Sequence, residues 1–540
     1  MRTAPGVISG GRFLLTAGTG FEPATSGDKA VAAKITTRRV WCPPGKASVH
    51  IAIACRPLTH TEVKSENGIG CRSRNPLGTD MILGVMSATI DRLDIGALPL
   101  APKNPLPIRQ VLSAARVLHT GLALLSEAGG PVTRFVPLPK FVAPALVLVT
   151  SPSGVRDVLG RTDELTERCQ IHEEVRNLAG DNLFSLPNRE WAPRRRALQP
   201  VFTKQNVDGF GRHMTQAAQT FADHWREVGD VDLDAECRRL AMRSLGRSIL
   251  GVDVNEFGNE IAQNMHVASA YATDRALRPI RAPRWLPTPA RRRARAAVAA
   301  MRHVTMDILQ ACRADPTRDA PLIQALIAAT DPDTGQPLSD DDISNELLIF
   351  MLSGHDTTAT MLTYAFWELG HHPDMQDRVA AEVAEIGDRE LTPEDVPRLE
   401  YTAQVLNESL RLCPPAAGVG RLALRDIAVD GYRVEAGTIV AVGINALHRD
   451  PALWERPLVF DPDRFSPENS TNRDRWHFIP FAAGPRSCIG EHFAMLVTTL
   501  ALATIVRSIR IRSTDKDFPL ESPCTTVAKG PIPAHVDARL

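Results

Sequence analysis

The sequence predicts a mainly α-helical protein that contains small β-sheets. Most of the chain after residue 95 has the pattern of helices, and the clearest helix runs from about 340 to 370. Short segments at 145–150 and 437–444 are rich in β-branched residues, which is typical of strands. We therefore expect helices to form most of the structure and the strands to form only small sheets.

The composition limits the classes of partner and site. Sixty-two Lys and Arg residues balance sixty-two Asp and Glu residues, so the chain lacks the basic field of a nucleic-acid-binding protein. The nine cysteines are scattered and form no CxxC pair, which argues against a disulfide framework and a zinc site and favours the reducing cytoplasm. No apolar run reaches the roughly 18 to 20 residues that a membrane-spanning helix needs. We expect no nucleic acid, no transmembrane segment and a cytoplasmic location.

Residues 1–80 differ from the rest of the chain. They show no sustained period of 2 or 3.6, so we expect a poorly ordered N-terminal extension, followed by one domain over 81–540. The segment 17–26 resembles translated non-coding DNA, and Met81 is an alternative start, so we expect that the natural protein begins near Met81. An amphipathic targeting helix is disfavoured because no regular apolar face accompanies the arginines.

The helix predicted at 340–370 has strong ends and a weak centre. Ser339 is a good N-cap, and the three Asp residues at 340–342 suit the positive end of the helix dipole. The centre reads SGHDTT, in which Gly354 lowers helix propensity. Two interpretations stay open: a buried functional site at the centre, or a kink where a neighbouring element packs closely against Gly354.

The segment around 275–295 is dense in proline and arginine. The simplest interpretation is a solvated connection between two helices, the second of which begins at about 290. The alternative is a flexible lid or a membrane-surface contact, because Trp285 and Leu286 lie among basic residues.

The segment FIPFAAGPRSCIG, at 478–490, places Cys488 between a turn and the start of an apolar helix. Backbone N–H groups at a helix N-terminus stabilise a thiolate, and Gly490 lets a bulky group approach the backbone. A single thiolate makes a poor structural zinc site but can be the fifth ligand of a haem iron.

Three further motifs carry charged side chains. In NESLRL, Glu408 and Arg411 are three residues apart on a helix and can pair. The segment FDPDRF carries Arg464 in an extended proline turn. In EWAPRRRALQPVF, Trp191 and Arg195 are four residues apart, and we expect a helix whose first turn contains Pro193.

Together these motifs resemble the cytochrome P-450 family over roughly residues 95–540. The cysteine loop resembles the family's cysteine signature, and SGHDTT resembles its central helix. ESLR resembles the family's Glu-x-x-Arg helix, and DPDRF resembles the arginine turn that follows it. The resemblance implies a single triangular domain with haem b (iron protoporphyrin IX) between the central helix and the cysteine loop. It implies Cys488 as the iron ligand. The implied partners of the haem propionates are Trp191, Arg195, Arg421 and Arg486.

The resemblance also assigns roles outside the haem. Asp356 and Thr357 match the family's acid–alcohol pair, which delivers protons to oxygen bound at the iron. We expect His355, beside them, to pack on the outer side of the helix. The Glu408, Arg411 and Arg464 set resembles the family's structural ion-pair network.

The function that the resemblance implies is a monooxygenase that inserts one atom of dioxygen into a small apolar organic substrate, such as a fatty acid, a terpenoid or a steroid-like molecule. Electrons are expected from a separate ferredoxin and ferredoxin reductase, with Arg194 and Arg196 as docking residues, and we expect a monomer. Two alternatives remain: a peroxide-driven or isomerising enzyme of the same fold, and a non-catalytic haem carrier or sensor.

Overall fold

The computed structural model describes residues 5–8, 31–34, 94–136, 143–160, 165–253, 258–278, 280–330 and 335–539. The chain divides into two compact units, Met1–Leu93 and Asp94–Leu540. In the first unit, β1 (Pro5–Ile8) and β2 (Val31–Lys34) pair antiparallel. The rest of the extension predicted over 1–80 and the proposed start at Met81 lie outside the described residues.

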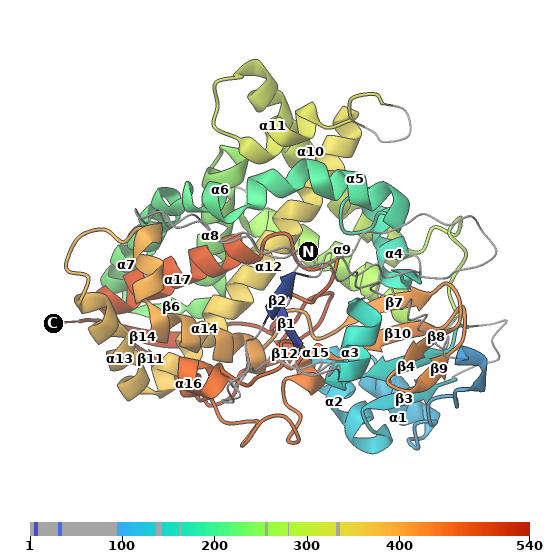
Figure 1. The fold of residues 1–540 in the computed structure, drawn as a ribbon. Coiled ribbons are helices and arrows are strands. Elements are labelled where there is room, and N and C mark those ends of the chain that lie inside the picture. Colours follow the sequence, from blue (N-terminus) through green and yellow to red (C-terminus); the bar gives the residue numbers. More distant parts are fainter. Residues whose placement is uncertain are drawn as a thin grey trace, which may run out of the picture. The chain divides into compact units, whose positions relative to one another are not determined.

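The second unit is mainly helical, as predicted (Figure 1). The helices of its first half are α1 (Ile108–Ala114), α2 (Leu118–Gly129), α3 (Pro152–Leu159), α4 (Gln170–Ala179), α5 (Asn188–Leu198), α6 (Lys204–Asp208), α7 (Gly211–Val228), α8 (Leu233–Leu245) and α9 (Gly258–Leu277). Those of its second half are α10 (Pro289–Ala314), α11 (Pro321–Ala328), α12 (Asp340–His371), α13 (Pro373–Ala384), α14 (Glu400–Leu412), α15 (Ile444–Leu447), α16 (Pro467–Ser470) and α17 (Glu491–Ser508).

The strands form small sheets, which confirms the second part of the prediction. The largest has the order β3-β4-β10-β7-β5. Its strands are β3 (Val132–Phe135), β4 (Leu146–Val149), β5 (Thr166–Arg168), β7 (Val419–Ala423) and β10 (Ile439–Val442). The two predicted strand segments are β4 and β10, which pair in parallel, and their Val side chains form an apolar core with residues of β3 and β7. The others are β6 (Asp230–Asp232), β8 (Ile427–Val429), β9 (Tyr432–Val434), β11 (Ile509–Ser513), β12 (Leu520–Glu521), β13 (Val527–Ala528) and β14 (Pro533–Ala538).

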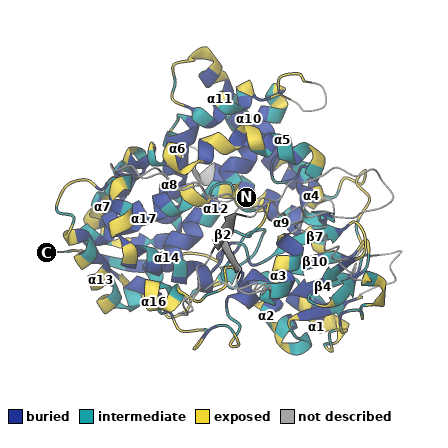
Figure 2. Ribbon diagram, viewed as in Figure 1, coloured by how far each residue is buried: buried dark blue, intermediate teal, exposed yellow. Residues whose placement is uncertain are grey.

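Helix α12 is the axis of the helical part and confirms the helix predicted over 340–370. Its 32 residues span about 48 Å. The Ser339 hydroxyl accepts a hydrogen bond from the Asp342 N–H at 3.1 Å, as expected of the N-cap. The helix packs against α8, α10, α14 and α17, and Figure 2 shows it mostly buried. A helix this buried holds its polar centre inside the molecule.

Large side chains lock α12 to its neighbours. The rings of Trp225 on α7 and Phe366 on α12 meet edge to face, with centroids 5.4 Å apart. The Trp225 indole N–H donates to Glu236 Oε2 on α8 at 3.0 Å. Because both the apolar and the polar parts of Trp225 are satisfied, α7, α8 and α12 are fixed relative to one another.

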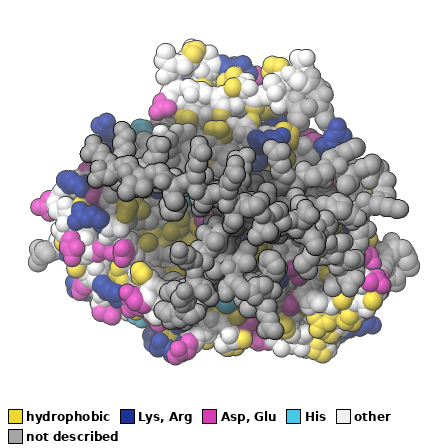
Figure 3. Space-filling view, viewed as in Figure 1, with side chains coloured by type: hydrophobic (Ala, Val, Ile, Leu, Met, Phe, Trp, Pro, Cys, Tyr) yellow, Lys and Arg dark blue, Asp and Glu magenta, His cyan; other side chains and the backbone are white. Residues whose placement is uncertain are grey.

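Charges of both signs are mixed over α13 and α16, at the lower left of Figure 3. This surface is what the zero net charge of the sequence leads one to expect. Within the described ranges, none of the helices combines the length and the apolar character required to cross a membrane.

Candidate functional site

The loop before α17 has a fixed turn geometry. Gly484 has φ 77°, and a Cβ atom there would lie 1.8 Å from the Leu159 carbonyl oxygen, so only glycine fits. The Cys488 N–H donates to the Phe481 carbonyl oxygen at 2.9 Å, which closes the loop. This turn places Cys488 just ahead of α17, which packs against α12.

The Cys488 side chain is accessible within protein surroundings. Cys488 is exposed, yet burial raises the pKa of its thiol, and this effect outweighs the opposing backbone hydrogen bond from Gly490. The thiol is therefore accessible to a ligand, while the protein atoms around it disfavour its charged form. The expected stabilisation of the thiolate by the helix N-terminus is therefore present but is the weaker effect.

The centre of α12 has one open face. Ser353 is exposed and Thr357 is half-buried, whereas His355 and Asp356 between them are buried. The Thr357 hydroxyl donates to the Ser353 carbonyl oxygen at 2.5 Å. The side chains of Ser353 and Thr357 therefore face an accessible space in the middle of an otherwise buried helix.

Gly354 has a packing role on another face of α12. A Cβ atom at this position would lie 2.9 Å from the Leu245 Cδ1 atom of α8. The packing interpretation of the SGHDTT segment is therefore confirmed at Gly354, which admits α8. Its neighbours Ser353 and Thr357 line an open space, and the functional site there stays a prediction.

Asp356 is held by two basic side chains. Its Oδ1 atom accepts hydrogen bonds from Arg238 Nη1 of α8 at 2.5 Å and from His355 Nδ1 at 2.9 Å. Burial alone would raise the pKa of Asp356, but His355 and Arg238 outweigh this effect and lower it. His355 is 2% exposed, so it is packed in the interior, and its bond to Asp356 also puts it in contact with the predicted acid.

Helix α5 connects the cysteine loop to the rest of the protein. The Arg486 guanidinium lies over the Trp191 ring, with its Cζ atom 4.4 Å from the ring centroid. Arg195 Nη1 donates to the Ser487 carbonyl oxygen at 3.0 Å. The structure thus brings together three of the predicted haem-binding residues. Pro193 is the sixth residue of α5 rather than part of its first turn, because the helix begins at Asn188.

A cluster of arginines surrounds the start of α5. Arg421 on β7 lies directly opposite Arg168 on β5 in the sheet register. Burial is the main cause that lowers the pKa of Arg168, and the positive charges of Arg421 and Arg486 lower it further. Arg168 was not predicted as a site residue, because its pairing with a strand some 250 residues later leaves no local signal in the sequence.

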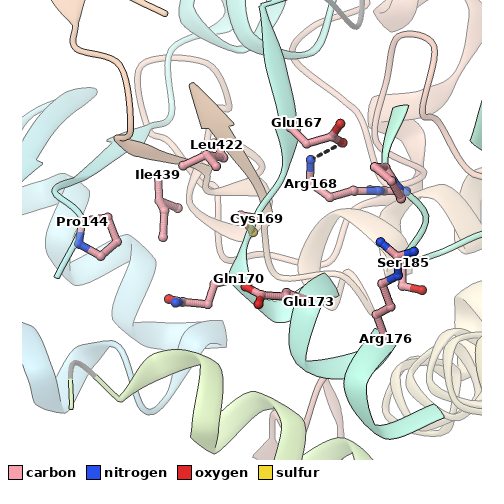
Figure 4. Close-up of a pocket in the computed structure, with 11 residues that line it drawn as sticks. Pro144, Glu167, Arg168, Cys169, Gln170, Glu173, Arg176, Ser185, Leu422 and Ile439 are labelled. Atoms are coloured by element: carbon pink, nitrogen blue, oxygen red, sulfur yellow. Dashed lines mark hydrogen bonds between the residues drawn. The ribbon is translucent and has the colours of Figure 1, made fainter. Parts of the chain in front are cut away.

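A cavity of about 240 Å³ adjoins this cluster (Figure 4). Arg168, Gln170 and Ser185 are among the side chains that line it, and the Glu167 carboxylate accepts a hydrogen bond from the Arg168 backbone N–H at 2.7 Å. Glu167 Oε1 also lies 3.6 Å from Arg486 Nη2. The Arg168 Nε atom is buried and has no hydrogen-bond partner among the described residues.

These residues fit an anionic haem. The arginines at 168, 421 and 486 lie close enough together that the charges of Arg421 and Arg486 lower the pKa of Arg168, and buried propionates among them would be stabilised by this positive field. The unpaired Arg168 Nε atom is a donor that such a carboxylate can satisfy. The accessible Cys488 thiol supplies a suitable iron ligand.

Arg194 is unsuited to the docking role expected from the sequence. Its Nη1 atom lies 2.6 Å from Glu346 Oε1 of α12, and the two side chains are 7% and 0% exposed. Arg194 therefore links α5 to α12 in the interior, whereas Arg196 is exposed.

The predicted ion-pair network is present and buried. Arg411 Nη2 and Nε donate to the two carboxylate oxygens of Glu408, each at 2.7 Å. Arg464 Nε lies 3.3 Å from Glu408 Oε1. These residues hold α14 to the 3₁₀ turn Pro462–Phe465.

Comparisons with known proteins find the family that the sequence motifs resemble. The family model Cytochrome P450 matches residues 101–537. Cyclooctat-9-en-7-ol 5-monooxygenase of Streptomyces melanosporofaciens is 29% identical over 394 residues, which cover 73% of this chain and 86% of the relative. Pentalenene oxygenase of Streptomyces avermitilis is 28% identical over 420 residues, covering 77% of this chain and 90% of the relative.

A solved structure shows the same fold. The heme domain of a mutant of cytochrome P450DA superposes with a TM-score of 0.70 at 25% sequence identity, covering 82% of this chain and 98% of that domain. The predictions of the fold class, of haem b and of a monooxygenase are confirmed by these matches. The chain belongs to the cytochrome P450 family.

Proposed function

We propose that this P450 inserts one oxygen atom from dioxygen into an apolar organic substrate, with electrons from a separate ferredoxin and ferredoxin reductase. One observation carries the proposal. The half-buried Thr357 hydroxyl faces an open space at the centre of the buried helix α12. The accessible Cys488 thiol lies on the loop that leads into α17, which packs against α12. A peroxide-driven or isomerising enzyme needs no proton delivery to dioxygen, so the open polar face would have no role in it.

In this proposal Cys488 binds the haem iron, and Trp191, Arg195, Arg421 and Arg486 surround the propionates. Haem with a thiolate ligand supplies electron density that favours cleavage of the O–O bond. The hydrogen bond from Arg195 to Ser487 orients the loop beside the thiolate. Arg486 also donates to Asn188 Oδ1 and to the Leu186 carbonyl oxygen, so it fixes the loop as well as contributing charge.

Asp356 and Thr357 have different parts in proton delivery. The Thr357 hydroxyl lies on the open face and can orient a water molecule or a proton toward the space beside the helix. Asp356 is ionised and lies behind it, bonded to His355 and Arg238. Asp356 therefore passes protons on by accepting them transiently, rather than by storing one.

The substrate class is proposed from the relatives as well as from the site. Two relatives carry names that specify cyclooctat-9-en-7-ol and pentalenene, both largely hydrocarbon by name. We therefore propose a terpenoid-like substrate for this protein. Fatty acids and steroid-like molecules are the other apolar classes to be compared with it. A panel of such compounds, scored by the spectral shift on displacement of the iron-bound water, tests it.

Thr357→Ala is expected to uncouple electron consumption from product formation. The substitution removes the hydroxyl on the open face, and loss of a positioned proton-transfer group typically costs about 100-fold or more in rate. The measurement is the product formed per NADPH consumed, with ferredoxin and reductase supplied.

Thr363→Ala is the matched control for this experiment. Thr363 lies on the same helix and donates to the Ala359 carbonyl oxygen at 2.8 Å, but it is fully buried away from the open face. Its variant should retain coupling. Unchanged coupling in Thr357→Ala would contradict the monooxygenase mechanism and favour a peroxide-driven enzyme.

Arg196→Glu is expected to slow the first electron transfer from an acidic ferredoxin. Arg196 is exposed and follows Arg195, which contacts the cysteine loop. Charges at the edge of an interface act mainly on the association rate and on its salt dependence. Stopped-flow reduction at low and high salt measures both, with the exposed Arg116→Glu as the control. Equal rates for the two variants would exclude docking at Arg196.

A further inference from the structure

Helix α12 carries two neighbouring aromatic side chains that connect its buried side to the surface. Tyr364, one of four tyrosines in the chain, is 9% exposed, whereas Trp367 is half-buried. Their ring centroids are 5.6 Å apart. We call these two residues the aromatic pair. Because the rings are in contact, the pair joins a buried phenol to a side chain that reaches solvent.

The aromatic pair is held in place by hydrogen bonds and by two further rings. The Trp367 indole N–H donates to the Asp515 carbonyl oxygen at 3.1 Å. The Phe518 ring meets Tyr364 and Trp367 near its edge, with centroids 5.1 and 5.4 Å away. The His371 ring packs on Trp367 with centroids 4.6 Å apart. The contact between Tyr364 and Trp367 is therefore fixed by the fold.

Tyr364 lies on the same face of α12 as Thr357. The two residues are seven positions apart, which is nearly two full turns and about 10.5 Å along the helix axis. Thr357 borders the open space in which the proposed function places the activation of dioxygen. Tyr364 is therefore the inner end of the aromatic pair, and Trp367 is the outer end.

The Tyr364 hydroxyl is hydrogen-bonded to the carboxylate of Glu368, which is 7% exposed. Burial raises the pKa of Glu368 to about 7, although the bond from Tyr364 opposes this effect. A carboxyl group with this pKa can take up and release a proton at neutral pH. Phenylalanine at position 364 would fill the same space without a buried acidic partner, so packing alone does not account for the polar pair.

We propose that the aromatic pair supplies electrons to the haem when dioxygen has been activated but no substrate is oxidised. Tyr364 gives one electron to the oxidised haem, and its phenol proton passes to Glu368. Trp367 then returns an electron to Tyr364, which takes its proton back from Glu368. A soluble one-electron reductant restores Trp367 at the surface. Each cycle moves one electron from this reductant to the haem and leaves the three residues unchanged.

The inference rests on the proposed function, because the oxidising equivalent comes from activated dioxygen. It gives Tyr364, Trp367 and Glu368 a part that oxygen insertion does not require. The expected benefit is protection, since an oxidising equivalent that has no substrate otherwise damages the haem and the side chains around it.

The test mixes the holoprotein with hydrogen peroxide, which oxidises the haem without substrate or reductase, and freezes the sample for electron paramagnetic resonance. Ring-deuterated tyrosine identifies a tyrosyl radical by its narrowed signal. The parent protein should form this radical, whereas Tyr364→Phe should lose it and should also lose its haem absorption faster. Trp367→Phe keeps Tyr364 but lacks the next donor, so added ascorbate should remove the radical more slowly than in the parent.

Tyr432→Phe is the matched control, because Tyr432 is a half-buried tyrosine of β9 and its variant should keep the signal of the parent. Glu368→Gln is a second variant that keeps the volume and a hydrogen-bond acceptor but takes up no proton, so it should lower the yield of the radical. A parent protein that loses its haem absorption without a tyrosyl signal would overturn the inference. A Tyr364→Phe signal equal to that of Tyr432→Phe would overturn it as well. The coupling of Thr357→Ala tests the proposed function separately, so the two fail in different experiments.

Discussion

Cys488→Ala is expected to abolish the absorption band that a thiolate-ligated haem gives in its reduced carbon-monoxide complex, and with it all monooxygenase turnover. Cys488 is the accessible cysteine on the loop that leads into α17, and removing it leaves no sulfur at this position for the iron. Difference spectra before and after carbon monoxide measure the band directly, and total haem per protein is measured alongside.

Cys524→Ala is the matched control for this substitution. Cys524 is partly exposed and lies between β12 and β13, and burial raises the pKa of its thiol to about 11. The control variant should keep both the spectral band and turnover. If Cys488→Ala retained the band, the iron ligand would have to be another residue, and the assignment of the cysteine loop would fail.

Local sequence signals predicted the elements whose defining contacts lie within a few residues along the chain. The long α12 helix with its Ser339 cap, the two strands β4 and β10, and the Glu408–Arg411 pair all follow from spacing and side-chain type. The cysteine loop was predictable for the same reason, because its turn depends on Gly484 and on one backbone hydrogen bond across seven residues.

Contacts between distant segments were not predictable in this way. Arg168 joins the site only because β5 pairs with β7, and Arg238 reaches Asp356 only because α8 packs against α12. Arg194 looked like a surface cation among three consecutive arginines, yet it turns inward to Glu346. Which arginine of such a run is buried depends on the helix phase relative to a partner helix some 150 residues later, and one sequence does not contain that information.

Glu408→Gln is expected to lower the free energy of unfolding by about 3–5 kcal/mol, the range for removing one partner of a buried ion pair. Glu408 and Arg411 are both 0% exposed, so the substitution leaves an uncompensated guanidinium in the interior. Arg464 also loses its carboxylate neighbour at 3.3 Å, and the backbone N–H of Asp461 loses a charged acceptor at 2.9 Å. Glutamine fills nearly the same volume, so the loss reports charge and hydrogen bonding rather than a cavity.

The remaining bonds of Arg411 explain why this loss should reach beyond α14. Its Nη1 atom donates to the His448 and Pro457 carbonyl oxygens at 3.0 and 2.6 Å, so one guanidinium joins the helix to two segments that precede the cysteine loop. Without the Glu408 carboxylate, the Arg411 guanidinium is no longer oriented, and those segments lose a common anchor. Haem release, measured as transfer to an apo-haem acceptor, should therefore accelerate along with the fall in the urea midpoint.

Glu455→Gln is the control for this substitution. The Glu455 carboxylate is 89% exposed and lies 4.0 Å from Arg456, so its variant should change the free energy of unfolding by less than about 0.5 kcal/mol. A Glu408→Gln protein that matched this control would show that the network contributes little to the fold and that its buried charges are offset elsewhere.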